Sequence, residues 1–82
     1  MSDNILVELS IEFAVKIVKL TEQMDGRAVL RNQILKSGTS IGANIREGNY
    51  AQSKADFVSK FQIALKECYE TEYWLELFQK QI

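Results

Sequence analysis

The 82-residue chain has no proline, no histidine and a single cysteine, and it contains no apolar run long enough to cross a membrane. Without histidine and with one cysteine, the chain has almost no ligands for a zinc site, and it cannot form an internal disulfide. Its first residues also lack the basic and then apolar layout of a signal peptide. We therefore expect no cofactor, no metal, no membrane contact and no small-molecule substrate, and a cytoplasmic location.

The chain also has no large excess of either positive or negative charge. Ten basic and eleven acidic residues leave a net charge of −1. Generic nucleic-acid binding requires a strongly basic domain, so the overall charge does not favour it, although a local basic patch remains possible. A chain of this length forms one small domain, residues 1–82, with a limited core and a thin margin of stability unless it self-associates.

The spacing of apolar residues predicts three helices, over about residues 4–24, 28–48 and 54–82. The first helix carries two apolar stripes, which together cover about two-thirds of its circumference, wider than the stripe of an ordinary surface helix. It should end near Gly26, because glycine suits the left-handed conformation that closes a helix. Such a helix requires packing partners on two sides.

The third helix is also apolar on two sides. It begins with Ser53 as its predicted cap, and its core positions repeat with heptad spacing, interrupted by Thr71. Cys68 falls on this core face, so we predict that it packs there as an inert side chain. The opposite side forms a candidate interface, which either contacts another subunit or seats a fourth helix: Ile63, Tyr73, Trp74 and Leu77.

The second helix contains the segment SGTSIGANIREG, residues 37–48. Each interior glycine costs a helix about 1 kcal/mol relative to alanine, so two glycines one turn apart indicate close approach by another helix. A phosphate-binding loop is a poor alternative, because Gly42 is not followed by the lysine that such a loop requires. The predicted packing motif comprises Ser37, Gly38, Ile41, Gly42, Asn44 and Ile45.

Polar side chains near the core faces need hydrogen-bond partners. We expect Ser37, Asn44 and Glu72 to pair with one another, with the backbone or with water. The acidic run at Glu67, Glu70, Glu72 and Glu76 is most simply a solvated or salt-bridged face. The second helix carries four basic residues, which form the best available candidate for a weak nucleic-acid contact: Arg27, Arg31, Lys36 and Arg46.

Four segments in this order resemble one known family: FAVKIVKL (13–20), SGTSIGANIREG (37–48), QSKADFVSKFQIALKE (52–67) and ETEYWLEL (70–77). They resemble the four-helix-bundle proteins that are encoded in intervening sequences of 23S rRNA genes and are often labelled S23 ribosomal proteins. The resemblance covers almost the whole chain.

The resemblance implies an all-α, antiparallel, up-and-down bundle of the four-helix type. It implies that three long helices are present in this chain and that the fourth is missing or truncated. It also implies a homo-oligomer, a pentamer, and a relation to the strongly basic accessory proteins of diversity-generating retroelements, which work with RNA. This chain lacks their basic excess.

The sequence therefore predicts a non-enzymatic, self-assembling helical bundle that acts as a scaffold or interaction module. The alternative is an accessory protein that binds RNA or DNA.

Overall fold

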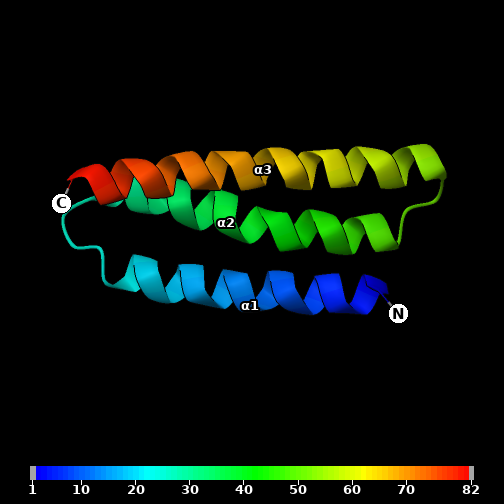
Figure 1. Ribbon diagram of the computed structural model, residues 1–82, viewed down its shortest axis with the longest axis horizontal. Coiled ribbons are helices and arrows are strands. Elements are labelled where there is room, and N and C mark those ends of the chain that lie inside the picture. The colour runs from blue at the N-terminus through cyan, green and yellow to red at the C-terminus, as the bar shows by residue number, and fades with distance from the viewer. Residues whose placement is uncertain (1, 82) are drawn as a thin grey trace.

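The computed structural model describes residues 2–81, with side chains described from residue 5 onward, and it contains three helices joined by two short connections. The helices are α1 (Ser2–Glu22), α2 (Ala28–Asn49) and α3 (Lys54–Gln81). Figure 1 shows them side by side and antiparallel, with α2 between α1 and α3 and with the two chain ends at opposite ends of the molecule. The all-α, antiparallel fold class predicted from the sequence is confirmed.

The turn between α1 and α2 follows from two local features. Gly26 adopts a positive φ of 75°, which a residue with a Cβ rarely adopts. The predicted end of the first helix is slightly wrong, because α1 ends at Glu22. Met24, predicted to be the last residue of that helix, lies in the turn and is buried beneath it.

The start of α3 is set by Ser53, whose Oγ accepts a hydrogen bond from the Asp56 backbone N–H at 3.1 Å. This bond satisfies one of the amide groups that a helix leaves unpaired in its first turn. The cap therefore fixes where the chain turns back along α2.

The core consists of two clusters that follow α2. One contains Ile17, Met24, Leu30 and Ile34, and the other contains Ile41, Ile45 and Ala64. Phe13 packs against both clusters. Because α2 supplies buried residues to both clusters, it is the central element of the fold.

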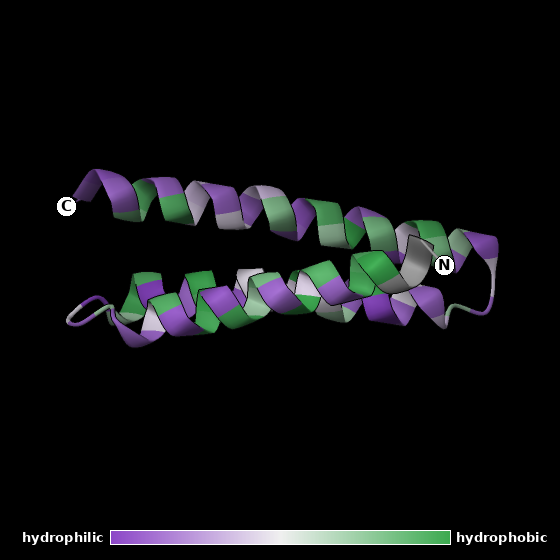
Figure 2. Cartoon of the chain, turned by 60° about the horizontal axis from the view of Figure 1, so that its bottom comes forward, coloured by the Kyte–Doolittle hydropathy of each residue, from purple (hydrophilic) through white to green (hydrophobic). Residues whose placement is uncertain are grey.

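The three helices do not form a closed bundle. Among the residues that the structure describes, α1 and α3 each pack against α2, but no Cα atom of α1 lies within 8 Å of a Cα atom of α3. Figure 2 shows apolar and polar residues mixed along the length of all three helices. Apolar side chains of α1 and α3 consequently remain exposed, and they form the surfaces described next.

Candidate functional site

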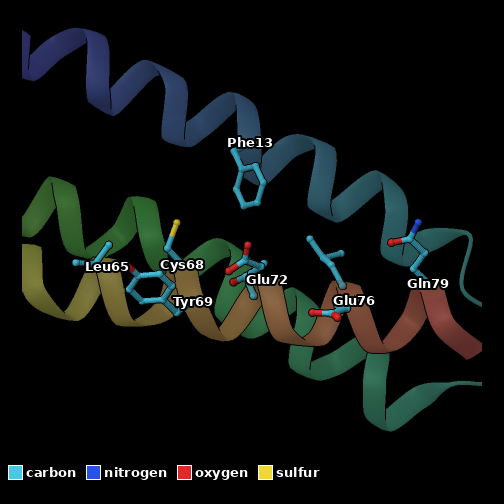
Figure 3. A pocket seen from close by; sticks show the side chains of 9 residues that line it. Phe13, Leu65, Cys68, Tyr69, Glu72, Glu76 and Gln79 are labelled. Atoms are coloured by element: carbon cyan, nitrogen blue, oxygen red, sulfur yellow. The ribbon is translucent and has the colours of Figure 1, made fainter.

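A groove of about 610 Å³ separates α1 from α3, and we call it the α1–α3 groove. Phe13 forms its wall on α1 and points toward α3, as Figure 3 shows. The wall on α3 is formed by residues from four successive turns: Leu65, Cys68, Tyr69, Thr71, Glu72, Leu75, Glu76 and Gln79. The groove is therefore a long, mainly apolar channel with two carboxylates on one side.

Cys68 is exposed in this groove, so the prediction that it packs inside the core is wrong. The heptad spacing placed it on an apolar face of α3 correctly. That face is wider than the strip that α2 covers, because α2 contacts the line through Ala64 and Thr71, which are the buried residues of α3. Cys68 lies beside that line, and no helix of the described chain covers it.

A second exposed surface lies on the other side of α1. We call it the α1 outer face and define it by Ile11, Ala14, Val15 and Val18. Ile11 and Ala14 also line a hollow shared with Gly42, Ala43 and Arg46 of α2. Ile11 and Val15 are 45% and 46% exposed and lie one turn apart, so they form adjacent apolar surface on α1.

The candidate interface on α3 divides into two parts. Tyr73 is 58% exposed and Ile63 is also exposed, whereas Trp74 and Leu77 are half-buried and pack against the first core cluster. Trp74 also contacts the Tyr73 ring edge-on at a centroid distance of 4.9 Å, and its indole N–H donates to Glu70 Oε2 at 3.4 Å. The exposed residues are Ile63 and Tyr73, which lie ten positions, about 15 Å, apart along α3, and we refer to these two residues together as the α3 outer face.

The small residues of α2 lie where helices approach closely. A Cβ atom placed on Gly38 would lie 2.9 Å from both Cγ atoms of Ile17, and one on Gly42 would lie 3.0 Å from Ser10 Oγ. Both contacts are with α1. Gly48, which the packing motif did not include, approaches Phe61 of α3 in the same way, at 2.8 Å.

The remaining members of the motif are buried or paired. Ile41 and Ile45 belong to the second core cluster. The Asn44 amide donates to the backbone carbonyl of Ser40 at 2.9 Å. Glu72 lies exposed on the groove and is not paired with Ser37 or Asn44.

A buried hydrogen bond joins α2 to α3. Thr71 Oγ1 lies 2.9 Å from Ser37 Oγ, and each hydroxyl also lies close to a backbone carbonyl of its own helix, Glu67 at 2.7 Å for Thr71 and Gln33 at 2.9 Å for Ser37. Because each hydroxyl has one proton, one of them donates to the other hydroxyl and the second donates to its carbonyl. In the sequence, Thr71 is visible only as an interruption of an apolar row. A threonine at a core position facing a helix that also carries a buried serine was the available signal for this bond.

The four basic residues of α2 do not come together. Arg27 lies 5.9 Å over the Phe78 ring, and Arg31 donates to the Met24 carbonyl at 3.4 Å. Lys36 and Arg46 are exposed further along the helix. Arg27, which is the N-cap residue of α2, and Arg46 are 19 positions apart, about 28 Å along the helix axis, so the four residues do not form a single patch.

Charged groups elsewhere show one clear interaction. Lys60 Nζ lies 2.9 Å from Glu47 Oε1, and this hydrogen bond and the negative charge raise the pKa of Lys60 above 10.5. No ion pair of the acidic run with Arg31, Lys36 or Arg46 occurs within residues 2–81. In the same part of the chain, no three His, Cys, Asp or Glu side chains gather as they would to hold a metal ion.

These features define a class: an antiparallel all-α protein with an open groove and exposed apolar helix faces. Residues 2–81 match the family model of the 23S rRNA-intervening sequence proteins, and the chain belongs to that family. No curated protein matches it. Within the described residues, no helix is long and apolar enough to cross a membrane.

A similar solved structure comes from Bacteroides thetaiotaomicron and is described as a protein of unknown function from the S23 ribosomal protein family. It is 55% identical in sequence, and the superposition has a TM-score of 0.92. The match covers 99% of this chain and 75% of that chain.

Proposed function

We propose that this S23-family protein is a non-enzymatic scaffold that assembles with copies of itself through its exposed helix faces. The observation that carries this proposal is the α1 outer face, where Ile11, Val15 and Val18 are all substantially exposed. Contiguous exposed apolar surface of this kind marks interaction sites in stable proteins. A self-assembling module of this type suits the reducing cytoplasm, because its one thiol has no disulfide partner in the chain.

The arrangement of the faces favours a ring. The α1 outer face and the α3 outer face are different surfaces, so a contact between them is head-to-tail rather than self-complementary. Head-to-tail contacts close into a ring when the rotation that relates neighbouring subunits is a whole fraction of a full turn. We propose a pentamer, which is the assembly that the family resemblance implies.

The experiment that tests this proposal compares molecular masses of variants in solution. In the double variant Val15→Glu/Val18→Glu, two carboxylates replace apolar contacts that are each worth about 1.5–3 kcal/mol when buried. We expect light scattering to show dissociation to smaller species while circular dichroism shows an unchanged helix content.

The matched control for that variant is Asn32→Asp/Gln52→Glu, which adds the same charge at two exposed positions outside both the α1 outer face and the α3 outer face. The control should keep the wild-type mass. Equal masses for wild type and both variants would show that the α1 outer face does not hold the assembly together.

A role in binding RNA or DNA, like that of the retroelement accessory proteins, is the second candidate. Its support is that Lys36 and Arg46 are exposed on α2. Binding through them should weaken as salt rises, and it should fall in Lys36→Ala/Arg46→Ala. Absence of binding to any polynucleotide at low salt would rule out this candidate.

A further inference from the structure

We propose that each copy in the assembly inserts Tyr73 of its α3 helix into the hollow between α1 and α2 of the next copy, and that its Glu76 pairs there with Arg46. The inference rests on the proposed self-assembly, and it specifies which residues make the contact. The hollow shares no lining residue with the α1–α3 groove, and the contact does not depend on what covers that groove.

The receiving surface is the hollow of about 330 Å³ between α1 and α2, which we call the α1–α2 hollow. Its lining includes Ala14, Gly42 and Ala43, which have small side chains or none, so the opening has room for one aromatic side chain. Ala14 also belongs to the α1 outer face, and the hollow therefore continues the surface that is proposed for assembly.

Hydrogen-bond donors around the hollow select an occupant that carries acceptors. The hydroxyl groups of Ser10 and Thr39 donate to backbone carbonyls of their own helices, each at 2.7 Å. Arg46 is exposed, and within the described chain no carboxylate oxygen lies within 4.0 Å of its guanidinium. A guanidinium has five N–H donors, and covering it without an anion is costly. The occupant must therefore combine an apolar body with acceptor oxygens beside Arg46.

Tyr73 and Glu76 together have this form. Tyr73 is 58% exposed on α3, and its ring contacts the Trp74 ring edge-on at a centroid distance of 4.9 Å. A tyrosine has an apolar ring and a hydroxyl group that needs a partner when it is buried. Glu76 lies three residues further on, beside Tyr73, and no Lys or Arg nitrogen of the residues that the structure describes lies within 4.0 Å of its carboxylate.

The positions of the other two tyrosines identify a second copy as the occupant and Tyr73 as the inserted residue. Tyr69 lines the α1–α3 groove. Tyr50 is 83% exposed, but it follows Arg46 by one turn on α2 and so belongs to the receiving side. The chain carries both halves of the contact, the hollow on α1 and α2 and the projecting ring on α3. Such a contact is head-to-tail, and each copy in a ring uses both halves once.

The test mixes two variants of the full chain, each of which lacks one half of the contact. Tyr73→Ala removes the projecting ring. Ala43→Glu, at an exposed position, places a carboxylate in the hollow that pairs with Arg46 and repels Glu76. Each variant alone should be monomeric by light scattering. In the mixture, Tyr73 of one variant meets the intact hollow of the other, so we expect a dimer with one chain of each kind.

Charge reversal tests the ion pair separately. Arg46→Glu and Glu76→Arg should each weaken association by about tenfold or more, because like charges then meet across the contact. Arg46→Glu/Glu76→Arg restores opposite charges and should recover association to within about threefold of the wild type. The matched controls Lys16→Glu and Glu12→Arg reverse exposed charges on α1 outside the hollow and should leave association unchanged.

Two results would overturn the inference: masses that neither Tyr73→Ala nor Ala43→Glu changes, or two monomeric variants that stay monomeric when they are mixed. A double reversal that associates as weakly as the single reversals would contradict the Arg46–Glu76 pair. The mass of the wild type separates these failures from that of the proposed function. If the wild type is an oligomer, either result refutes only the Tyr73 contact, whereas a monomeric wild type refutes self-assembly as a whole.

Discussion

At the scale of single residues, Gly38 and Gly42 determine how closely α1 and α2 approach. The prediction of close approach could be made from the sequence because small residues one turn apart are visible in one dimension. Which side chain fills the space could not be predicted, because that depends on the register of α1 against α2. The structure identifies Ile17 opposite Gly38 and Ser10 opposite Gly42.

The Gly38→Ala variant should be destabilised. Alanine improves helix propensity by about 1 kcal/mol, but the added methyl would lie 2.9 Å from Ile17, and overpacking typically costs about 1–3 kcal/mol. The two Cγ atoms of Ile17 belong to a β-branched side chain, which has little rotational freedom. We expect a net loss of about 1 kcal/mol in the free energy of unfolding, measured by urea denaturation.

A double-mutant cycle checks the cause. In an Ile17→Ala background the obstructing atoms are gone, so Gly38→Ala should become stabilising by up to about 1 kcal/mol through helix propensity alone. If Gly38→Ala changes the free energy of unfolding equally in both backgrounds, contact with Ile17 is not the reason why position 38 requires glycine.

Ser37 and Thr71 form the other residue-scale feature, and it was only half visible in the sequence. The expectation that Ser37 would find a polar partner holds, but the partner lies 34 residues away and its identity depends on how α3 packs on α2. Local patterns carry no information on such a pairing.

Thr71→Val should lower the free energy of unfolding by about 1–2 kcal/mol, because it removes the hydroxyl but keeps the shape in a buried position. Thr71→Val/Ser37→Ala should cost less than the sum of the two single changes, since removing both polar groups leaves no unsatisfied partner. Thermal denaturation of the four proteins measures the difference. Strict additivity would mean that the two hydroxyl groups do not interact.

At the scale of elements, the structure shows how the far end of α2 is joined to α3. Lys60 and Glu47 form an ion pair near the α2–α3 turn, and Gly48 allows Phe61 to pack against the same end of α2. The three helices and their order followed from apolar periodicity. The observed end of the first helix lies two residues before the predicted end, because the last residue of a helix depends on the turn that follows it.

The Lys60–Glu47 pair lies at the surface, so it makes only a small contribution to stability, and that contribution depends on alkaline pH. The folded state raises the pKa of Lys60 above 10.5, so the pair's contribution to stability is fully present below that pH and is lost as the pH rises through the folded-state pKa. Glu47→Gln removes the cause, and NMR titration should show the pKa of Lys60 returning toward 10.5. An unchanged pKa in this variant would contradict the assignment.

At the scale of the whole molecule, two exposed faces and an open groove are the dominant features. The two-sided character of the first and third helices was predictable because their apolar stripes are too wide for one neighbour. The sequence could not show which stripe α2 covers. For this reason Cys68 was expected inside the core, whereas it lies in the groove beside Leu65 and Leu75.

The central claim is that this chain assembles with itself, and its mass in solution tests that claim most directly. We would measure the mass by light scattering over a hundredfold range of concentration. We expect one defined oligomer, of about five chains, that dissociates only on dilution. A monomer of 9.4 kDa at every concentration would contradict it.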